Sequence, residues 1–166
     1  MGGESLRNVD GDLGVLAGRL LFSVQAELFR RLHSAGFTDI SPRHGMVLAY
    51  LRPSGIRATE IARLAGQHKQ VIGKNIDELE ELGYVERKPD PDDRRAKLVL
   101  PTDRGRRQMR TADAIMAEIA GQHERLLGEK EFDRFLHQLR AIVASQREAV
   151  HDDSADDGAR GEPASS

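Results

Sequence analysis

Residues 58–105 constrain the fold of this chain most, because glycines divide them into two short helical segments that lead into two strand-like runs. Residues 58–66 and 67–82 carry apolar side chains at helical spacing, and each segment ends at a glycine. Residues 84–88 and 96–101 carry aromatic, β-branched and alternating apolar residues around a seven-residue loop. Two consecutive helices followed by a hairpin predict a winged helix-turn-helix.

A helix is predicted over 41–51, because Ser41 suits the N-cap and Pro42 the first helical position. Further helical segments are predicted on both sides, over about 12–34, 102–127 and 129–150. Their apolar stripes are too wide for one winged helix to cover. The simplest prediction is a dimer core shared by two chains, and an intramolecular core is the alternative. The predicted interface residues are Leu13, Leu16, Leu20, Phe132, Phe135, Leu136, Leu139, Ile142 and Val143.

Composition excludes several classes of protein. The chain of 166 residues contains no cysteine, so disulfides and thiolate metal ligands are excluded, and its six histidines lack metal-ligand spacing. No phosphate-binding loop or nucleophile motif is present, so we expect neither an enzyme nor a bound cofactor or metal. No apolar run approaches the ~18–20 residues of a membrane span, and no secretory signal is visible, which predicts a cytoplasmic protein without a membrane partner.

Charge is distributed unevenly along the chain. The formal net charge is -2, yet residues 87–110 hold nine Lys or Arg against four Asp. Residues 152–166 hold five acids and one Arg. The local field, rather than the net charge, is what a phosphate backbone would meet.

The second helical segment, 67–82, has an unusual polar face. His68, Lys69, Gln70 and Lys74 lie in its N-terminal half, whereas its C-terminal half is acidic. This order opposes the helix dipole. A recognition helix would explain it, because its N-terminal residues approach base edges and phosphates, and Gly73 would allow close approach. An ordinary amphipathic helix with a solvated face is the alternative.

The loop between the two strands carries acids and arginines together. Arg94 and Arg95 suit the negative potential of a narrow minor groove. We expect Asp93 to cap or pair within the loop and so to fix the angle of an arginine, whereas Asp90 and Asp92 are expected to be solvated. A wholly solvated charge cluster is the alternative interpretation of this loop.

These features predict a mainly α protein with a small β-hairpin, in which N- and C-terminal dimerisation helices flank a winged helix-turn-helix. We expect a disordered N-terminus over 1–11, a dimerisation helix within 12–40 and a DNA-binding winged helix-turn-helix over 41–101. Dimerisation helices are expected over 102–150, and a disordered acidic tail over 151–166.

Residues 60–105 resemble the DNA-binding core of the multiple antibiotic resistance regulator (MarR) family. The resemblance lies in EIARLAG, in the exit LEELGYVER into the first wing strand, and in the run DDRRAKLVLPTDRG across the wing. It implies a homodimeric bacterial transcription regulator, usually a repressor, on a near-palindromic double-stranded DNA operator. The recognition helix would enter the major groove through Lys69, Gln70, Gly73 and Lys74, and the wing arginine Arg95 the minor groove.

The chain departs from the family pattern at three places. Gln70, Val71 and Gly73 stand where the family often has small hydroxyl residues, so base preference does not transfer. Asn75 stands at a usually apolar position. Pro101 replaces a common residue just before Thr102, the predicted cap of the helical segment 102–127, and is expected to end the second wing strand early.

The resemblance also implies a small, often anionic aromatic effector, such as a phenolic compound or an aromatic acid. His33, Arg43 and His44 are the residues expected to face its pocket, and surface or internally satisfied side chains are the alternative. The favoured function is therefore a ligand-responsive, dimeric DNA-binding regulator. A helical protein-interaction module without specific DNA binding is the alternative from another class.

Overall fold

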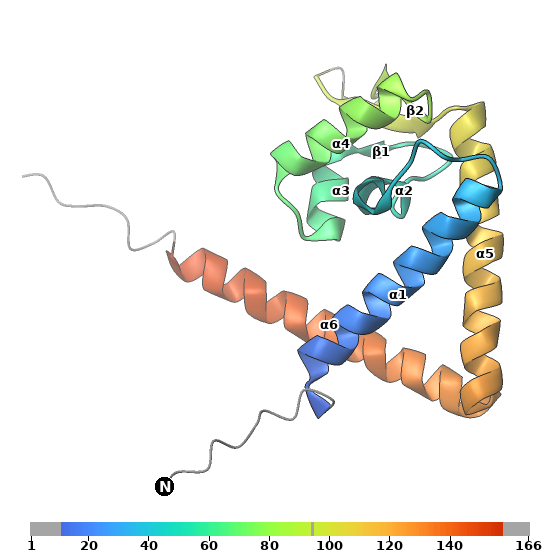
Figure 1. Cartoon of the computed structure of the whole chain (residues 1–166). Coiled ribbons are helices and arrows are strands. Elements are labelled where there is room, and N and C mark those ends of the chain that lie inside the picture. The colour runs from blue at the N-terminus through green and yellow to red at the C-terminus, as the bar shows by residue number, and fades with distance from the viewer. Residues whose placement is uncertain (1–10, 94, 158–166) are drawn as a thin grey trace, which may run out of the picture. The chain divides into compact units, whose positions relative to one another are not determined.

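The computed structural model describes residues 11–93 and 95–157, of which residues 149–157 are described as backbone only. Figure 1 shows a mainly helical chain with one small sheet. The chain divides into two compact units that meet within one long helix, between Glu118 and Ile119. The elements are α1 (Leu13–Ser34), η2 (Pro42–His44), α2 (Gly45–Leu48), β1 (Ile56–Arg57), α3 (Ala58–Ala65), α4 (Lys69–Glu81), β2 (Val85–Pro89), β3 (Lys97–Pro101), α5 (Asp103–Leu127) and α6 (Glu129–Asp157).

The helix-turn-helix prediction is confirmed by α3 and α4, which pack against each other. Gly66 ends α3 in the left-handed conformation, at φ 63°, which favours glycine because it has no Cβ. The inner face of α4 is formed by Ile72, Ile76 and Leu79, all fully buried. Burial of such side chains stabilises the fold by about 1.5–3 kcal/mol each, so this face fixes how α4 sits on the domain.

The segment predicted as one helix over 41–51 is shorter and tighter than expected. It begins as the 3-10 turn η2 and continues as the single α-turn α2. After Leu48 the hydrogen bonding shortens to three residues, with Tyr50 N donating to the carbonyl of Val47 at 3.0 Å. A proline at position 53 also disfavours helical backbone at Arg52, so the helix cannot continue to the turn.

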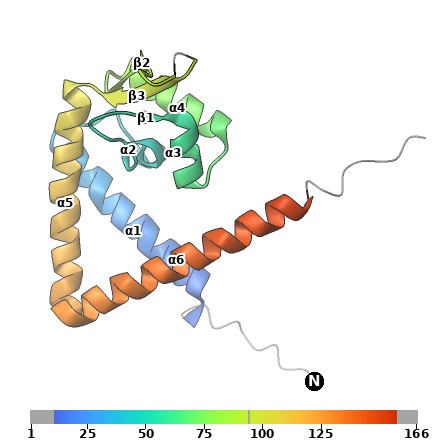
Figure 2. The ribbon, with the colours of Figure 1, turned by 180° about the vertical axis from the view of Figure 1, so that it is seen from behind.

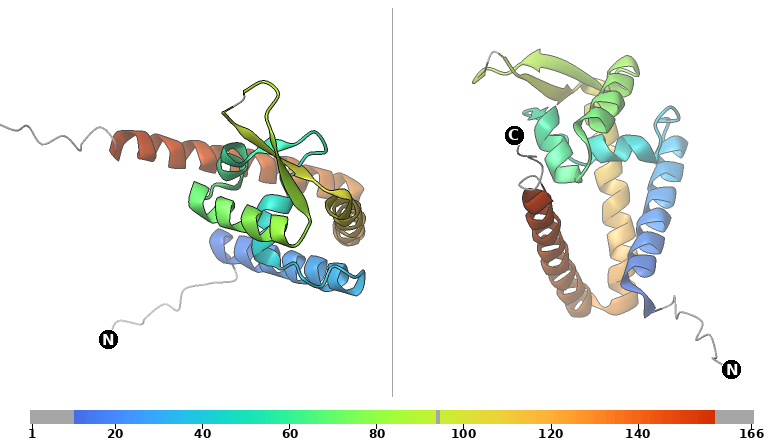
Figure 3. Two further views of the ribbon diagram at one scale, coloured as in Figure 1. Left: turned by 90° about the horizontal axis from the view of Figure 1, so that it is seen from above. Right: turned by 90° about the vertical axis from the view of Figure 1, so that its left-hand side faces the viewer.

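The sheet contains one strand more than the predicted hairpin. The strand order is β1-β3-β2, and both pairings are antiparallel. Figure 2 shows β1 and β2 on the two sides of β3, and Figure 3 shows that the tip of the hairpin projects away from α4. The early end expected at Pro101 is wrong, because Pro101 is paired with Val85 at the end of β3.

The start of α5 is fastened to the root of the hairpin. Thr102 is the predicted cap: its hydroxyl donates to the carbonyl of Gly83 at 2.6 Å and accepts from the amide of Gly105 at 3.1 Å. Beside it, the guanidinium of Arg104 lies 4.2 Å from the ring centre of Tyr84 and stacks on that ring. The hairpin therefore cannot shift at its root without disturbing α5.

The second unit begins at Ile119 with the last turns of α5 and continues as α6. Gly128, at φ 85°, separates the two helices. The rings of Phe132 and Phe135 are stacked with their centres 6.5 Å apart. The sequence predicted disorder from residue 151, whereas α6 extends to Asp157. The remaining tail and residues 1–10 lie outside the described residues.

Candidate functional site

The exposed side of α4 forms the first candidate surface, which we call the recognition face: His68, Lys69, Gln70, Gly73 and Lys74. All four side chains are exposed, and a Cβ added at Gly73 would meet nothing within 4 Å. Within the described part of the chain, neither lysine forms an ion pair. The face therefore presents free cationic and amide groups on a rigid helix.

The inner side of α4 explains the polar residue at a usually apolar position. Asn75 is buried, and its Nδ2 donates to the carbonyl of Val71, one turn earlier, at 2.9 Å. A buried amide with a partner inside its own helix avoids most of the cost of desolvation. Asn75 therefore belongs to the packing of α4, whereas Val71 is exposed beside the recognition face.

Two acids in the C-terminal half of α4, Asp77 and Glu80, are engaged by one cation. Arg87 of β2 forms ion pairs with Asp77, at 2.5 Å, and with Glu80. Because these acids are paired, they do not cancel the positive field of Lys69 and Lys74 one to three turns away. The reversed charge order noted in the sequence thus leaves a basic end and a partly neutralised acidic end.

Asp90 holds the wing at its base. From the sequence, this residue was expected to be solvated. Asp90 is only 5% exposed and accepts from Arg57 Nε at 2.7 Å and from the amide of Asp92 at 2.9 Å. The amide of Asp92, followed by the guanidinium of Arg57, holds the pKa of Asp90 below its ordinary value. This expectation was wrong because the partner, Arg57, lies 33 residues earlier in the chain.

Asp93 has the loop-internal contact that was predicted for it. Its Oδ1 accepts from the amide of Arg95 at 3.1 Å, and its Oδ2 lies 3.6 Å from Arg57 Nη1. The side chain of Arg95 is exposed and forms no ion pair with any residue that the structure describes. Arg94, the other predicted wing contact, lies outside the described residues.

The three residues expected at an effector pocket have other partners. His33 Nε2 lies 2.7 Å from the carbonyl oxygen of Ile40. His44 is buried and accepts the amide of Ser41 at Nδ1, so its Nε2–H donates to Glu78 at 3.0 Å. Arg43 pairs with Glu78 at 3.1 Å. The hydrogen bond from His44, and then the charge of Arg43, lower the pKa of Glu78.

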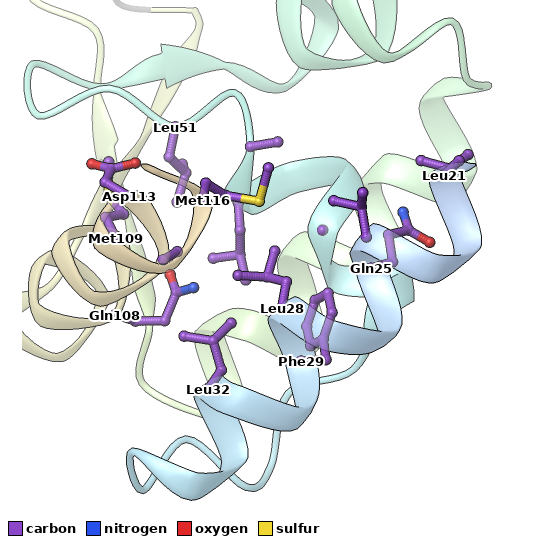
Figure 4. Close-up of a pocket in the computed structure, with 15 residues that line it drawn as sticks. Leu21, Gln25, Leu28, Phe29, Leu32, Leu51, Gln108, Met109, Asp113 and Met116 are labelled. Carbon is purple, nitrogen blue, oxygen red and sulfur yellow. The ribbon is translucent and has the colours of Figure 1, made fainter. Parts of the chain in front are cut away.

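A cavity of about 490 Å³ lies elsewhere in the first unit, and none of those three residues lines it. Figure 4 shows side chains of α1 and α5 around it. The lining comes from α1, from the region of α2 and from α5: Leu21, Val24, Gln25, Leu28, Phe29, Leu32, Gly45, Leu48, Ala49, Leu51, Gln108, Met109, Ala112, Asp113 and Met116. No pattern in the sequence indicates this pocket, because its walls are amphipathic helix faces from three distant segments.

The fold and the exposed basic surfaces define a winged helix-turn-helix DNA-binding protein. Residues 38–96 match the sequence profile of the MarR family. CouR from Rhodococcus jostii RHA1, in its structure with p-coumaroyl-CoA, is 27% identical, with a TM-score of 0.68 over 82% of this chain and 95% of that chain. The chain is therefore similar to the MarR family of transcription regulators over its winged helix-turn-helix.

Two further structures show the same similarity. The repressor CouR bound to a 23-mer DNA duplex is 28% identical, with a TM-score of 0.65 over 81% of this chain and 94% of that chain. A MarR-family regulator from Rhodococcus sp. RHA1 is 26% identical, with a TM-score of 0.67 over 82% and 97% of the two chains. No curated protein sequence matches the chain significantly. Among the described residues, no helix has the length and apolar character of a membrane span.

Proposed function

We propose that the protein is a homodimeric repressor that binds a palindromic operator in the cytoplasm. The observation that carries this proposal is the recognition face, whose lysines are exposed and unpaired in the described chain. In the proposed complex α4 enters the major groove and Arg95 the minor groove. The similarity to CouR, which has been solved on a DNA duplex, supports the same mode of binding.

Exposed apolar side chains support the dimer. Leu13 of α1 is 63% exposed, and Ile142 of α6 is 47% exposed. Leu16, Leu20, Phe135 and Val143 are also exposed, Leu136 and Leu139 are half-buried, and Phe132 is already buried within the chain. Large exposed apolar side chains on two helices are typical of a surface covered by a partner, here a second copy. Sedimentation that gave a stable monomer at micromolar concentration would contradict the dimer.

A small molecule is proposed to regulate DNA binding through the cavity in the first unit. CouR has been solved with p-coumaroyl-CoA bound, which supports ligand control in a related protein. The cavity is lined by α5, and the start of α5 is fastened to the hairpin root through Thr102. A ligand can shift DNA affinity only if it binds the two conformations differently, and a change in α5 provides that difference.

Fluorescence anisotropy with DNA from upstream of the protein's own gene tests operator binding. We expect half-sites about one helical turn apart and a steep loss of affinity with salt. Replacing Lys69 or Lys74 by Ala is expected to reduce the salt slope by about one each. Lys130→Ala, on exposed α6, is the matched control and is expected to leave it unchanged. Equal binding by all four proteins would exclude the recognition face as the DNA contact, and a wild type that does not bind this DNA would favour a protein-interaction module instead.

A further inference from the structure

The cavity has no basic side chain in its wall. Its polar side chains are Gln25, Gln108 and Asp113, and the remaining lining is apolar or glycine. This composition conflicts with the anionic aromatic effector expected from the family resemblance. Moving a carboxylate from water into an apolar cavity without a cation is strongly unfavourable.

Gln108 supplies the clearest sign of what the cavity would accept. Its side chain is 2% exposed, and its Oε1 has no hydrogen-bond partner among the described residues. Figure 4 shows it near Leu32 and Met109, with Asp113 next to Met109. A buried acceptor without a partner is costly and uncommon. A ligand that donates a hydrogen bond there would remove the cost.

Two further groups in the wall favour positive charge. Asp113 brings a carboxylate that forms no ion pair with any residue in the described ranges. The ring of Phe29 also lines the cavity, and the face of an aromatic ring attracts a cation. Met109 and Met116 add flexible, polarisable surface suited to a flat apolar body.

We propose that this cavity binds an apolar ligand with a protonated amine rather than an aromatic acid. The apolar walls hold the body of the ligand, while Gln108 accepts a hydrogen bond from the ammonium group and Asp113 provides the countercharge. A volume of about 490 Å³ suits a ligand of drug-like size. The inference rests on the proposed function, in which this cavity is the effector site.

Calorimetry on the full-length protein without DNA tests the charge preference. The probes are 2-naphthylmethylamine, 2-naphthylmethanol and 2-naphthoic acid, which share one apolar body and differ in charge. We expect the amine to bind most tightly and the acid at least about tenfold more weakly than the amine. An acid that binds as tightly as the amine, or an amine that does not bind, would overturn the proposal.

Variants locate the binding site and separate its contributions. Ala112→Phe fills the cavity and should abolish amine binding, and retained binding would mean that the amine sits elsewhere. Asp113→Asn should lower the affinity for the amine and leave the affinity for the alcohol unchanged. The loss for the amine should be only about two- to fivefold, because the carboxylate is exposed. Gln108→Met should weaken binding of both the amine and the alcohol, because each of them donates a hydrogen bond. Glu124→Gln, which removes the same charge from α5 outside the cavity wall, is the control and should change neither affinity.

The outcome is independent of DNA binding. A protein that prefers the amine but does not bind operator DNA would refute the proposed function and leave the ligand preference standing. A protein that binds operator DNA and prefers the acid would refute only this inference.

Discussion

Gly73→Ala separates the stability of α4 from its contact with DNA. Gly73 lies in the interior of α4, and an added Cβ would meet no atom within 4 Å. Alanine in an open helix interior stabilises the helix by about 0.8–1 kcal/mol relative to glycine. For a chain of this size, that gain raises Tm by about 2–4 °C. No other contact in the free protein offsets the gain.

The same methyl group is expected to weaken operator binding. In the proposed complex the backbone at Gly73 approaches the DNA closely, and a methyl group forced into a packed interface costs about 1–2 kcal/mol. That cost corresponds to roughly a tenfold loss of affinity. A more stable protein that binds its operator less tightly is an outcome that general destabilisation cannot produce.

Thermal unfolding and fluorescence anisotropy on the same preparations measure the two effects. Gly121→Ala is the matched control, because it makes the same change in α5, where the new Cβ would lie 3.4 Å from Arg125 Nη1, an ordinary contact. It should raise Tm without changing operator affinity. If Gly73→Ala binds the operator as tightly as the wild type, the backbone of α4 does not approach the DNA closely at this position.

Three further predictions concern the hairpin and its root. Gly105→Ala would place a Cβ 2.1 Å from the carbonyl oxygen of Tyr84, so the backbone must shift. We expect urea unfolding to show a loss of about 2–4 kcal/mol in the free energy of unfolding, and an unchanged midpoint would contradict this packing. Arg95→Ala should lower operator affinity and reduce the salt slope by about one, with Tm unchanged, and wild-type binding would exclude Arg95 from the groove. Asp90 has a lowered pKa in the folded state, so its stabilisation is complete above its unfolded value of 3.8 and disappears as the pH falls through the folded pKa. Asp90→Asn should therefore be less stable than the wild type at neutral pH, and the difference should shrink as the pH falls below 3.8; a difference independent of pH would disprove this role.

Local signals in the sequence were sufficient for the DNA-binding elements. Glycines and apolar periodicity determined the limits of α3, α4 and the hairpin to within about two residues. The strand β1 was missed because two residues are too short to show a period. Its pairing with β3 joins residues that are far apart in the chain, so no local pattern indicates it.

Roles that depend on distant partners could not be predicted. The loop acids look alike in the sequence, whereas in the structure Asp90 is buried and accepts hydrogen bonds from Arg57 and from the amide of Asp92. By sequence alone His44 is available to a ligand, whereas in the structure it is hydrogen-bonded to Glu78, 34 residues away. In both cases the deciding contact joins separate elements, and no residue spacing encodes it.

The lack of internal partners on the recognition face has an evolutionary consequence. Within the described chain, the side chains of Lys69, Gln70 and Lys74 hold no other part of the protein in place. Substitution there is expected to be nearly neutral for folding, since exposed positions without special contacts usually change stability little. A gene duplicate could thus acquire a new operator by drift at these positions alone, while the buried side of α4 keeps the same frame.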